Sequence, residues 1–361
     1  MPERTRSHPT SPRKKAHVEI AVRRNVGFRQ KTTGLERLDF VHNALPELNA
    51  SEVDPSTTFL GRTLAWPFMV SSMTGGYPDA LAINRSLAAV CEELRIALGV
   101  GSQRQALEDG RYHRTFSVVR EAAPTIPIVG NIGAAEVARM QSADQARRLV
   151  DLIRADALAI HLNPLQELLQ KEGTPDFRNV VTGIGLLARE LPVPVIVKEI
   201  GAGISGAVAR RLLEAGVRYI DVAGAGGTSW AGVEILRNRS NAPGEAFWDW
   251  GIPTLTALRE VAALRAEVPD LTVIASGGIT SGLEAAKCVA LGAQLAGTAR
   301  PVLTALRQGG VGALRRLLVG WEREFRGAMF LTGSRSVGDL RRARTWITGS
   351  TRQKTKKRKG E

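Results

Sequence analysis

Eight short apolar runs recur along the chain, and each ends in small or polar residues. The runs consist of Val, Ile, Leu and Ala without regular polar alternation, which is typical of strands buried on both faces of a parallel sheet. Eight such runs predict a closed barrel. They are PFMVSSM (67–73), IALGVGSQ (96–103), PIVGNIG (127–133), ALAIHLN (157–163), PVIVKEI (194–200), YIDVAGAGG (219–227), TVIASGG (272–278) and LAGTAR (295–300).

Helix-forming stretches separate these runs. Residues 79–94 and 142–154 are rich in Ala, Leu, Arg and Glu, and each is long enough for one helix. The alternation of strand and helix predicts an α/β protein with a (β/α)8 TIM barrel. Functional groups of such barrels lie at the carboxyl ends of the strands, so we expect the site where polar residues follow the apolar runs.

The length of 361 residues suits one barrel with extensions, because such a barrel needs about 250 residues. We predict an N-terminal arm and pre-barrel segment at 1–60, the barrel at 61–345 and a disordered basic tail at 346–361. No apolar stretch approaches the roughly 20 residues that cross a bilayer, and no apolar region follows the charged N-terminus as in a secretory signal. We therefore expect a cytoplasmic protein, with Cys91 and Cys288 as core thiols.

The net charge of +14 is concentrated at the two ends of the chain. Residues 1–15 carry five Arg or Lys and one Glu, and residues 341–361 carry nine and one. A terminal run such as KTKKRK (354–359) is typical of a solvated tail. The barrel shows no nucleic-acid recognition motif and few aromatic residues for stacking, so we expect no specific nucleic-acid partner. A basic protein that binds RNA or a membrane surface remains the alternative outside enzymes.

Two glycine-bearing turns follow the last two strands. Ser276-Gly277-Gly278 and Gly297-Thr298-Ala299 offer backbone N–H groups without bulky side chains. Barrels of this class bind phosphate in such turns, and the helix expected at 283–291 adds the positive end of its dipole. The turns predict a phosphate site, although a Gly-Gly pair can also serve only to make a tight turn.

Lys198 lies in the apolar run VIVKE, where a buried ammonium needs a partner. A salt bridge to Glu199 or Asp221 is one explanation. The other is a flavin, whose reduced ring carries negative charge beside N1 and C2. Asn131 and Ser102 can hydrogen-bond to a flavin edge. Because no GxGxxG motif links a strand to a helix, the mononucleotide FMN fits better than NAD or FAD.

The segment HLNPLQE (161–167) places four functional side chains within seven residues at the end of the fourth strand. His161, Asn163, Gln166 and Glu167 can converge over one pocket because Pro164 fixes the turn. The single carboxylate suits Mg²⁺, which binds one or two carboxylates together with water and substrate phosphates. Zinc is disfavoured, since the chain has neither an HExxH motif nor paired cysteines.

A cationic cluster precedes the barrel. Arg13, Lys14, Lys15 and His17 lie in an otherwise polar arm, and alone they are typical of a solvated charge run. If the arm folds across the barrel mouth towards Arg104, these groups together match a diphosphate.

Taken together, these motifs resemble type 2 isopentenyl-diphosphate Δ-isomerase, the FMN-dependent form. The resemblance covers about residues 10–345, and HLNPLQE followed by DVAGAGGTSW (221–230) is specific to that family. The motifs are RKKAH (13–17), SSMTGG (71–76), GSQR (101–104), GNIG (130–133), HLNPLQE, VKEIGAG (197–203), DVAGAGGTSW, WGIPT (250–254) and SGGI (276–279). The chain has Lys15 and Ala16 where the family often has acidic residues, and the tail after residue 350 has no counterpart.

The resemblance implies a role for each matched residue. Glu167 would bind Mg²⁺, Gln166 would lie over the reacting alkene with His161 and Asn163 in support, and Trp230 would shape the pocket wall. The diphosphate would be held by Arg13, Lys14, His17, Ser102, Gln103 and Arg104. FMN would be held by Ser72, Met73, Thr74, Ser102, Asn131, Lys198, Thr228, Gly277, Gly278, Gly297, Thr298 and Ala299.

The implied reaction moves the double bond of isopentenyl diphosphate to give dimethylallyl diphosphate in isoprenoid biosynthesis. Reduced FMN would act as acid and base, with NADPH as the reductant and no net redox change, and the enzyme would be a homotetramer or octamer. The alternative among enzymes is an FMN oxidoreductase of the 2-hydroxy-acid oxidase or dihydroorotate dehydrogenase type. A hydroxy-acid oxidase is expected to use a late histidine as base, and here the last histidine is His161.

Overall fold

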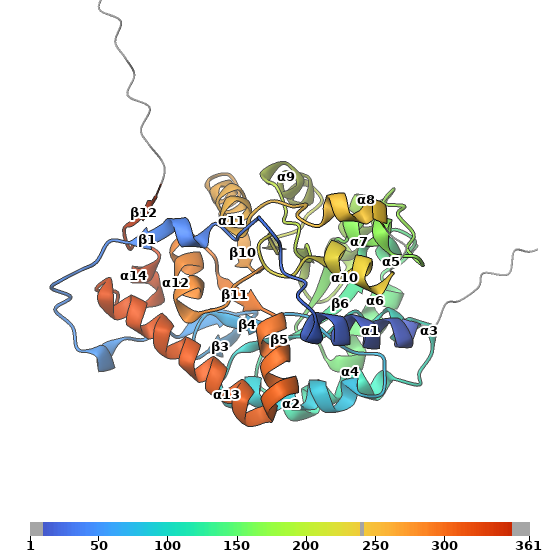
Figure 1. Cartoon of the computed structure of the whole chain (residues 1–361), viewed down its shortest axis with the longest axis horizontal. Coiled ribbons are helices and arrows are strands. Elements are labelled where there is room, and N and C mark those ends of the chain that lie inside the picture. The colour runs from blue at the N-terminus through green and yellow to red at the C-terminus, as the bar shows by residue number, and fades with distance from the viewer. Residues whose placement is uncertain (1–9, 239–241, 349–361) are drawn as a thin grey trace, which may run out of the picture.

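The computed structural model describes residues 10–238 and 242–348, and its centre is a closed barrel of eight parallel strands (Figure 1). Around the barrel the strands follow the order β10-β11-β4-β5-β6-β7-β8-β9. All eight strands predicted from the apolar runs are present. Their bounds are β4 (Phe68–Val70), β5 (Ala97–Gly99), β6 (Ile128–Gly133), β7 (Ala157–His161), β8 (Val195–Lys198), β9 (Tyr219–Asp221), β10 (Thr272–Ala275) and β11 (Leu295–Thr298).

Helices follow the strands and surround the barrel, which confirms the (β/α)8 prediction. The outer layer contains α2 (Ala80–Glu93), α4 (His113–Ala122), α6 (Asp144–Ile153), α8 (Val180–Glu190), α9 (Gly206–Glu214), α11 (Thr254–Ala263), α12 (Gly282–Ala290) and α13 (Arg300–Leu331). Shorter helices are α3 (Arg104–Glu108), α5 (Ala134–Val137), α7 (Pro164–Leu169), α10 (Trp230–Arg237) and α14 (Val337–Leu340), with short 3-10 helices η1 (Leu35–Arg37), η2 (Ala50–Glu52), η3 (Ala242–Phe247) and η4 (Leu264–Ala266). Within the described ranges, no helix is both long and apolar enough to cross a membrane.

Apolar side chains fill the barrel, and a hairpin closes its amino-terminal end. Met69, Val129 and Ile196 belong to one buried cluster inside the barrel. Phe59 and Leu64 join this cluster from the hairpin β2 (Thr57–Phe59) and β3 (Arg62–Leu64). The polar site can therefore form only at the opposite, carboxyl end.

The two predicted core thiols lie in outer helices. Cys91 on α2 and Cys288 on α12 are both buried and free of disulfides. Burial raises the pKa of each thiol, so both remain protonated and unreactive.

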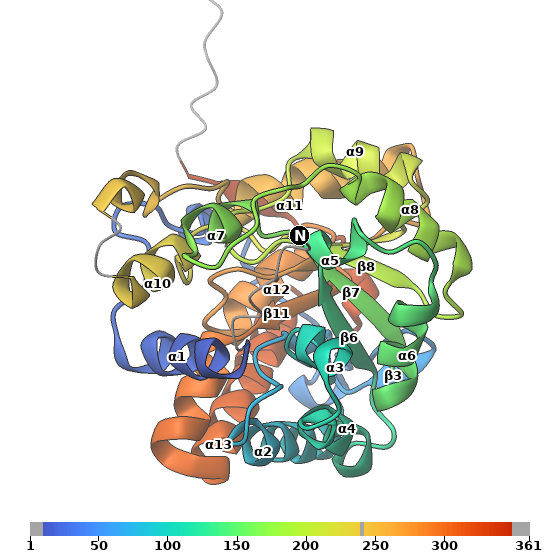
Figure 2. The same ribbon diagram turned by 90° about the vertical axis from the view of Figure 1, so that its right-hand side faces the viewer.

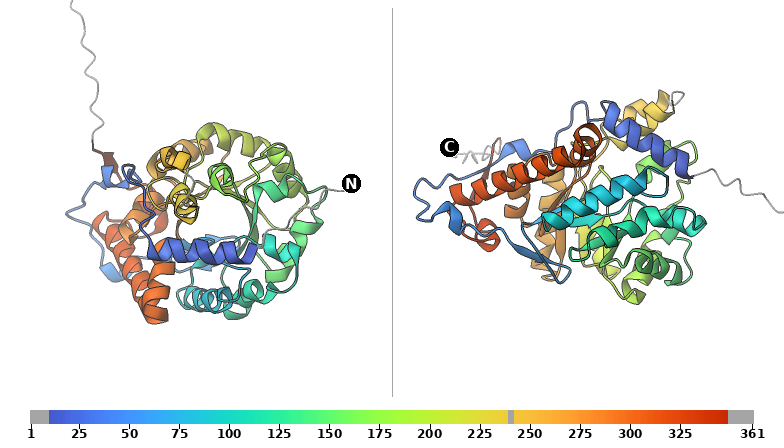
Figure 3. Two further views of the ribbon diagram at one scale, coloured as in Figure 1. Left: turned by 45° about the vertical axis from the view of Figure 1, so that its right-hand side comes forward. Right: turned by 90° about the horizontal axis from the view of Figure 1, so that it is seen from below.

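The predicted N-terminal arm contains the helix α1 (Thr10–Arg23), which lies across the carboxyl mouth of the barrel (Figures 2 and 3). Its neighbours are α10 and the start of α13. The chain then forms β1 (Leu38–Phe40), which pairs antiparallel with β12 (Thr345–Ile347). Ordered structure thus extends past the predicted tail boundary at residue 346. Residues 1–9 and most of that tail, 349–361, lie outside the described residues.

Candidate active site

A cavity of about 480 Å³ opens at the carboxyl ends of the strands, beneath α1. All eight barrel strands contribute to its lining, either with residues near their carboxyl ends or with the turns that follow them. The cavity brings together all but one of the predicted site residues, Gln103. Those that line it are Arg13, Lys14, His17, Ser72, Met73, Thr74, Ser102, Arg104, Asn131, His161, Asn163, Gln166, Glu167, Lys198, Thr228, Gly277, Gly278, Gly297, Thr298 and Ala299.

Gln103 was predicted to contact the diphosphate, but the structure places its side chain away from the cavity. Its side chain is fully buried, with Nε2 donating to the Leu149 carbonyl at 2.9 Å and Oε1 accepting from the Asn131 N–H at 3.0 Å. Ser102 and Arg104 on either side do line the cavity. Gln103 therefore ties the β5 turn to β6 and α6 instead of facing a ligand.

The two predicted phosphate turns lie at one end of the cavity, and their shape fits a phosphate. Gly277 and Gly278 have φ values of +98° and +75°, and a Cβ on Gly277 would collide with the carbonyl oxygen of Gly224. A Cβ on Gly297 would come within 2.7 Å of Ser71 Oγ. That hydroxyl is buried and has no hydrogen-bond partner among the described residues. Bare backbone and an unpartnered hydroxyl together fit the phosphate of FMN.

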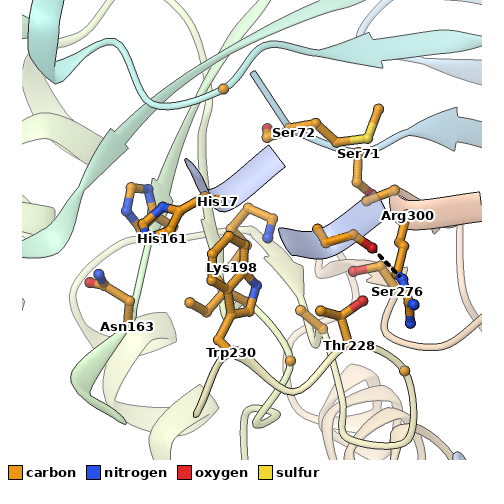
Figure 4. A pocket seen from close by; sticks show the side chains of 18 of the residues that line it. His17, Ser71, Ser72, His161, Asn163, Lys198, Thr228, Trp230, Ser276 and Arg300 are labelled. Atoms are coloured by element: carbon orange, nitrogen blue, oxygen red, sulfur yellow. Dashed lines mark hydrogen bonds between the residues drawn. The ribbon is translucent and has the colours of Figure 1, made fainter. Parts of the chain in front are cut away.

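Lys198 has a buried partner and also faces the cavity. Its Nζ lies 4.0 Å from Asp221 Oδ2 and donates to the Glu199 carbonyl at 2.5 Å. Ser276 Oγ donates to Asp221 Oδ1 at 2.7 Å. Of the two salt bridges considered from the sequence, the one to Asp221 is present. It leaves the ammonium at the cavity wall, so the structural and flavin interpretations are compatible (Figure 4).

The end of β7 supplies a neutral imidazole and an amide network. His161 Nδ1 lies 2.7 Å from Asn131 Oδ1. Burial, followed by the charges of Lys198 and Lys14, lowers the pKa of His161 to about 3, so its ring is neutral near pH 7. Figure 4 shows His161 and Asn163 on the opposite side of the cavity from Arg300 and Ser276.

Asn163 organises the other side chains of HLNPLQE. Its Nδ2 donates to Glu167 Oε1 at 3.0 Å and to Gln166 Oε1 at 3.2 Å. Its own Oδ1 is buried and without a partner among the described residues. Glu167 accepts a second bond, from the Thr174 N–H at 2.9 Å, which fixes both carboxylate oxygens while leaving lone pairs for a cation.

Glu234 on α10 is a residue that the sequence analysis missed. Its carboxylate is fully buried, accepts from Gln166 Nε2 at 3.0 Å and from Arg237 Nε at 2.8 Å, and lies 2.9 Å from His17 Nε2. Burial alone would raise its pKa, but His17 and Arg237 outweigh that effect and the pKa is lowered. The available signal was a carboxylate among the apolar residues of WAGVEILR.

The cations of α1 reach the same cavity, as the sequence predicted. Lys14 Nζ donates to the Ser102 carbonyl at 2.5 Å. Arg104 Nη1 lies 3.0 Å from Oε1 of Glu136, a cavity residue that the sequence analysis also missed. Burial, followed by the charge of Arg13, lowers the pKa of Lys14 to about 7. Repulsion between crowded cations is what an anionic ligand would relieve.

The chain is similar over nearly its whole length to curated isopentenyl-diphosphate delta-isomerases. It is 47% identical over 351 residues to the protein of Pelodictyon phaeoclathratiforme, covering 94% of this chain and 97% of that one. The protein of Chlorobium luteolum is 49% identical over 352 residues, with coverage of 94% and 97%. That of Methanothermobacter thermautotrophicus is 44% identical over 341 residues, with 94% coverage of both. The chain belongs to the isopentenyl-diphosphate delta-isomerase family.

A second match identifies the type of cofactor in this isopentenyl-diphosphate delta-isomerase family member. Residues 138–347, more than half of the chain, match the profile of the FMN-dependent dehydrogenase family. The protein is therefore an isomerase of the FMN-dependent type.

Solved structures give a likeness of fold alone. Mandelate oxidase with (S)-2-phenylpropionate superposes with a TM-score of 0.64 at 19% identity, covering 92% of this chain and 97% of that one. A mandelate oxidase point mutant with the monooxide FMN adduct gives 0.64 at 20% identity, covering 91% and 95%. At this identity the match shows a shared barrel and not a shared reaction.

Proposed function

We propose that the protein interconverts isopentenyl diphosphate and dimethylallyl diphosphate, with reduced FMN and Mg²⁺ bound in the cavity beneath α1. The observation that carries this proposal is the placement of two anion-binding regions in one cavity. Glycine turns line the cavity, the cations of α1 lie on its roof, and neutral polar side chains such as His161 and Asn163 line its wall. One region suits the phosphate of FMN, and the other suits the diphosphate of the substrate.

The phosphate of FMN would be held by the N–H groups of the turns at Gly277-Gly278 and 297–299, and the ring would extend past Thr228 and Asn131 to Lys198. The reduced flavin would supply an acid and base for the alkene, which is too weak a base for an ordinary side chain. Lys198 would stabilise negative charge at the ring edge from its position beside Asp221.

The diphosphate would be held from α1 and from α3. Arg13 and Lys14 would contact its oxygens directly, and Arg104 would exchange its contact with Glu136 for one with the diphosphate. Glu167 would bind Mg²⁺ with water and diphosphate oxygens as the other ligands. Among the described residues there is no cluster of three or more His, Cys, Asp or Glu for a metal, which suits an ion that depends on its substrate.

The isopentenyl group gains a proton at its terminal CH₂ and loses one at C2. Gln166 has no acidic proton at neutral pH, so we assign it orientation of the alkene or proton relay, in a position fixed by Asn163 and Glu234. Trp230 forms part of the wall and packs edge-on against His17 at 5.4 Å between ring centroids. Such a wall excludes water from the developing positive charge.

The oxidoreductase alternative is less well supported by this site. Oxidation of a 2-hydroxy acid needs a base that removes the hydroxyl proton. The cavity offers His161, whose pKa is lowered to about 3 by burial, and His17, which lies 2.9 Å from the buried Glu234. A base with a pKa near 3 removes such a proton poorly, whereas a neutral imidazole suits an environment for a developing carbocation.

The proposal is tested by the origin of the new methyl proton. FMN-reduced enzyme with Mg²⁺ and isopentenyl diphosphate is incubated in D₂O, and the product is examined by NMR and mass spectrometry. We expect dimethylallyl diphosphate with deuterium in the methyl group that derives from the terminal CH₂. Enzyme with oxidised FMN serves as the control. Failure to form dimethylallyl diphosphate, or its formation without solvent deuterium, would contradict the proposal.

A further inference from the structure

Arg300 connects the glycine-bearing turn at 297–299 to α1, the helix that lies over the cavity. It directly follows the turn at 297–299 and begins α13, and its side chain lines the cavity. From there Nε donates to the Ala21 carbonyl at 2.8 Å and Nη2 donates to the Arg24 carbonyl at 2.9 Å. A dashed line in Figure 4 marks a hydrogen bond of Arg300. One side chain therefore spans two elements that bind different anions in our account.

Ala21 lies in the last turn of α1 and Arg24 directly follows the helix, where backbone oxygens lack partners within the helix. A cation there also meets the negative end of the helix dipole. Lys14 lies seven residues before Ala21 on the same helix, or about 10 Å along its axis. Because α1 is a single helix, the position of its last turn determines where Lys14 and Arg13 reach into the cavity.

Within residues 10–238 and 242–348 no carboxylate pairs with Arg300, and the hydrogen bonds of its side chain there use Nε and Nη2. Burial lowers the pKa of this guanidinium. Guanidinium groups bind phosphate strongly, and the bare turn at Gly277-Gly278 lines the same cavity.

We propose that Arg300 is a positioning residue that couples the two anion sites, an inference that rests on the proposed diphosphate site. The FMN phosphate supplies the missing counter-charge and fixes the guanidinium, which then fixes the last turn of α1. The helix in turn holds Arg13 and Lys14 in place for the diphosphate. Coupling of this kind is reciprocal, so diphosphate must tighten FMN binding by the same factor by which FMN tightens diphosphate binding.

The experiment measures release of FMN from the full-length holoenzyme. Flavin fluorescence on serial dilution gives the dissociation constant of FMN with and without saturating inorganic diphosphate and Mg²⁺. The variants are Arg300→Met, which removes the charge, and Arg300→Lys, which keeps a charge but lacks the planar guanidinium whose separate nitrogens reach the two carbonyls. Arg315→Met is the matched control, because Arg315 lies on the same helix and pairs with Glu93 at 2.5 Å, away from the cavity.

In the wild type and in Arg315→Met we expect diphosphate to tighten FMN binding by at least about fivefold. In Arg300→Met we expect weaker FMN binding and a ratio near one. Should Arg300→Met retain no FMN, Arg300→Lys decides the matter, with a ratio clearly below that of the wild type. A wild-type ratio of one, or an unchanged ratio in the Arg300 variants, would overturn the inference. If diphosphate does not bind at all by calorimetry, the proposed substrate site itself is wrong, which is a distinguishable result.

Discussion

At the residue scale, the site depends on which charges are compensated and which are not. Lys198 has Asp221, and His17 lies beside Glu234, so both remain in place without a ligand. Lys14 donates to a carbonyl, and burial, followed by the charge of Arg13, lowers its pKa to about 7. An uncompensated cation in a cavity points to an anionic ligand, and this is the group whose titration should control substrate binding.

We predict that the protonation of Lys14 determines how kcat/KM depends on pH. Below pH 7 the free enzyme carries the charge, and above it the charge is lost, so kcat/KM should fall with rising pH. Between pH 7.5 and 8.5 we expect a fall of about tenfold. In Lys14→Arg the charge persists and the fall should move to higher pH, while Lys15→Met, which alters an exposed neighbour 3.8 Å from Asp79, should keep the wild-type profile. A flat wild-type profile from pH 7 to 9 would contradict this assignment.

We predict that replacing Gln166 lowers turnover without releasing the cofactor. Gln166→Ala removes the amide that Asn163 and Glu234 hold towards the cavity. We expect kcat to fall at least about a hundredfold, the usual range for a group acting in proton transfer. Flavin content and FMN affinity, measured by absorbance and fluorescence, should stay at wild-type values. Near-normal turnover with normal flavin content would show that Gln166 has no part in the reaction.

We predict that Glu167 determines the Mg²⁺ concentration that the enzyme requires. Glu167→Gln keeps the shape of the side chain but removes the negative charge that Mg²⁺ requires. The Mg²⁺ concentration for half-maximal activity should rise by about tenfold or more, and chelation should abolish wild-type activity. Glu121→Gln, which alters an exposed carboxylate paired with Arg114 outside the cavity, is the control. An unchanged Mg²⁺ requirement in Glu167→Gln would assign the metal to other ligands.

At the element scale, the strands and their turns were predictable because their signals are local. An unalternated apolar run reports burial on both faces wherever it occurs, and a Gly-Gly pair after a strand reports a turn that side chains would block. Gln103 was not placed correctly, because the partners of its side chain, Leu149 and Asn131, are 46 and 28 residues away in the chain. Glu234 was not predicted as a site residue, because its partner Gln166 is 68 residues away in the chain and no local pattern indicates that contact.

We predict that distorting the turn at Gly277 weakens FMN binding. An alanine there meets φ of +98° and the Gly224 backbone, so the turn must shift away from the phosphate. Gly216→Ala is a matched control, since Gly216 has φ of +94° but lies outside the cavity. Both variants should lose thermal stability. Only Gly277→Ala should weaken FMN binding, by about tenfold or more, and equal FMN affinities in the two variants would argue against a phosphate site at this turn.

At the scale of the whole molecule, α1 and the carboxyl ends of the barrel strands line one cavity. The charge cluster at 13–17 alone was typical of a solvated run, and the family resemblance implied its place at the substrate site. The structure places these residues on α1, across the barrel mouth (Figure 3). The helix was harder to predict than the strands, because its apolar residues are few and its position depends on contacts with α10 and α13. The oligomeric state remains a prediction from the family resemblance.

The most direct measurement is an anaerobic assay with isopentenyl diphosphate, FMN, Mg²⁺ and NADPH. Product is quantified by chromatography, and NADPH is followed by its absorbance. We expect many molecules of dimethylallyl diphosphate for each NADPH oxidised, because the flavin is reduced once and then reused. Oxidation of one NADPH for each molecule of product, or no dimethylallyl diphosphate at all, would contradict this expectation.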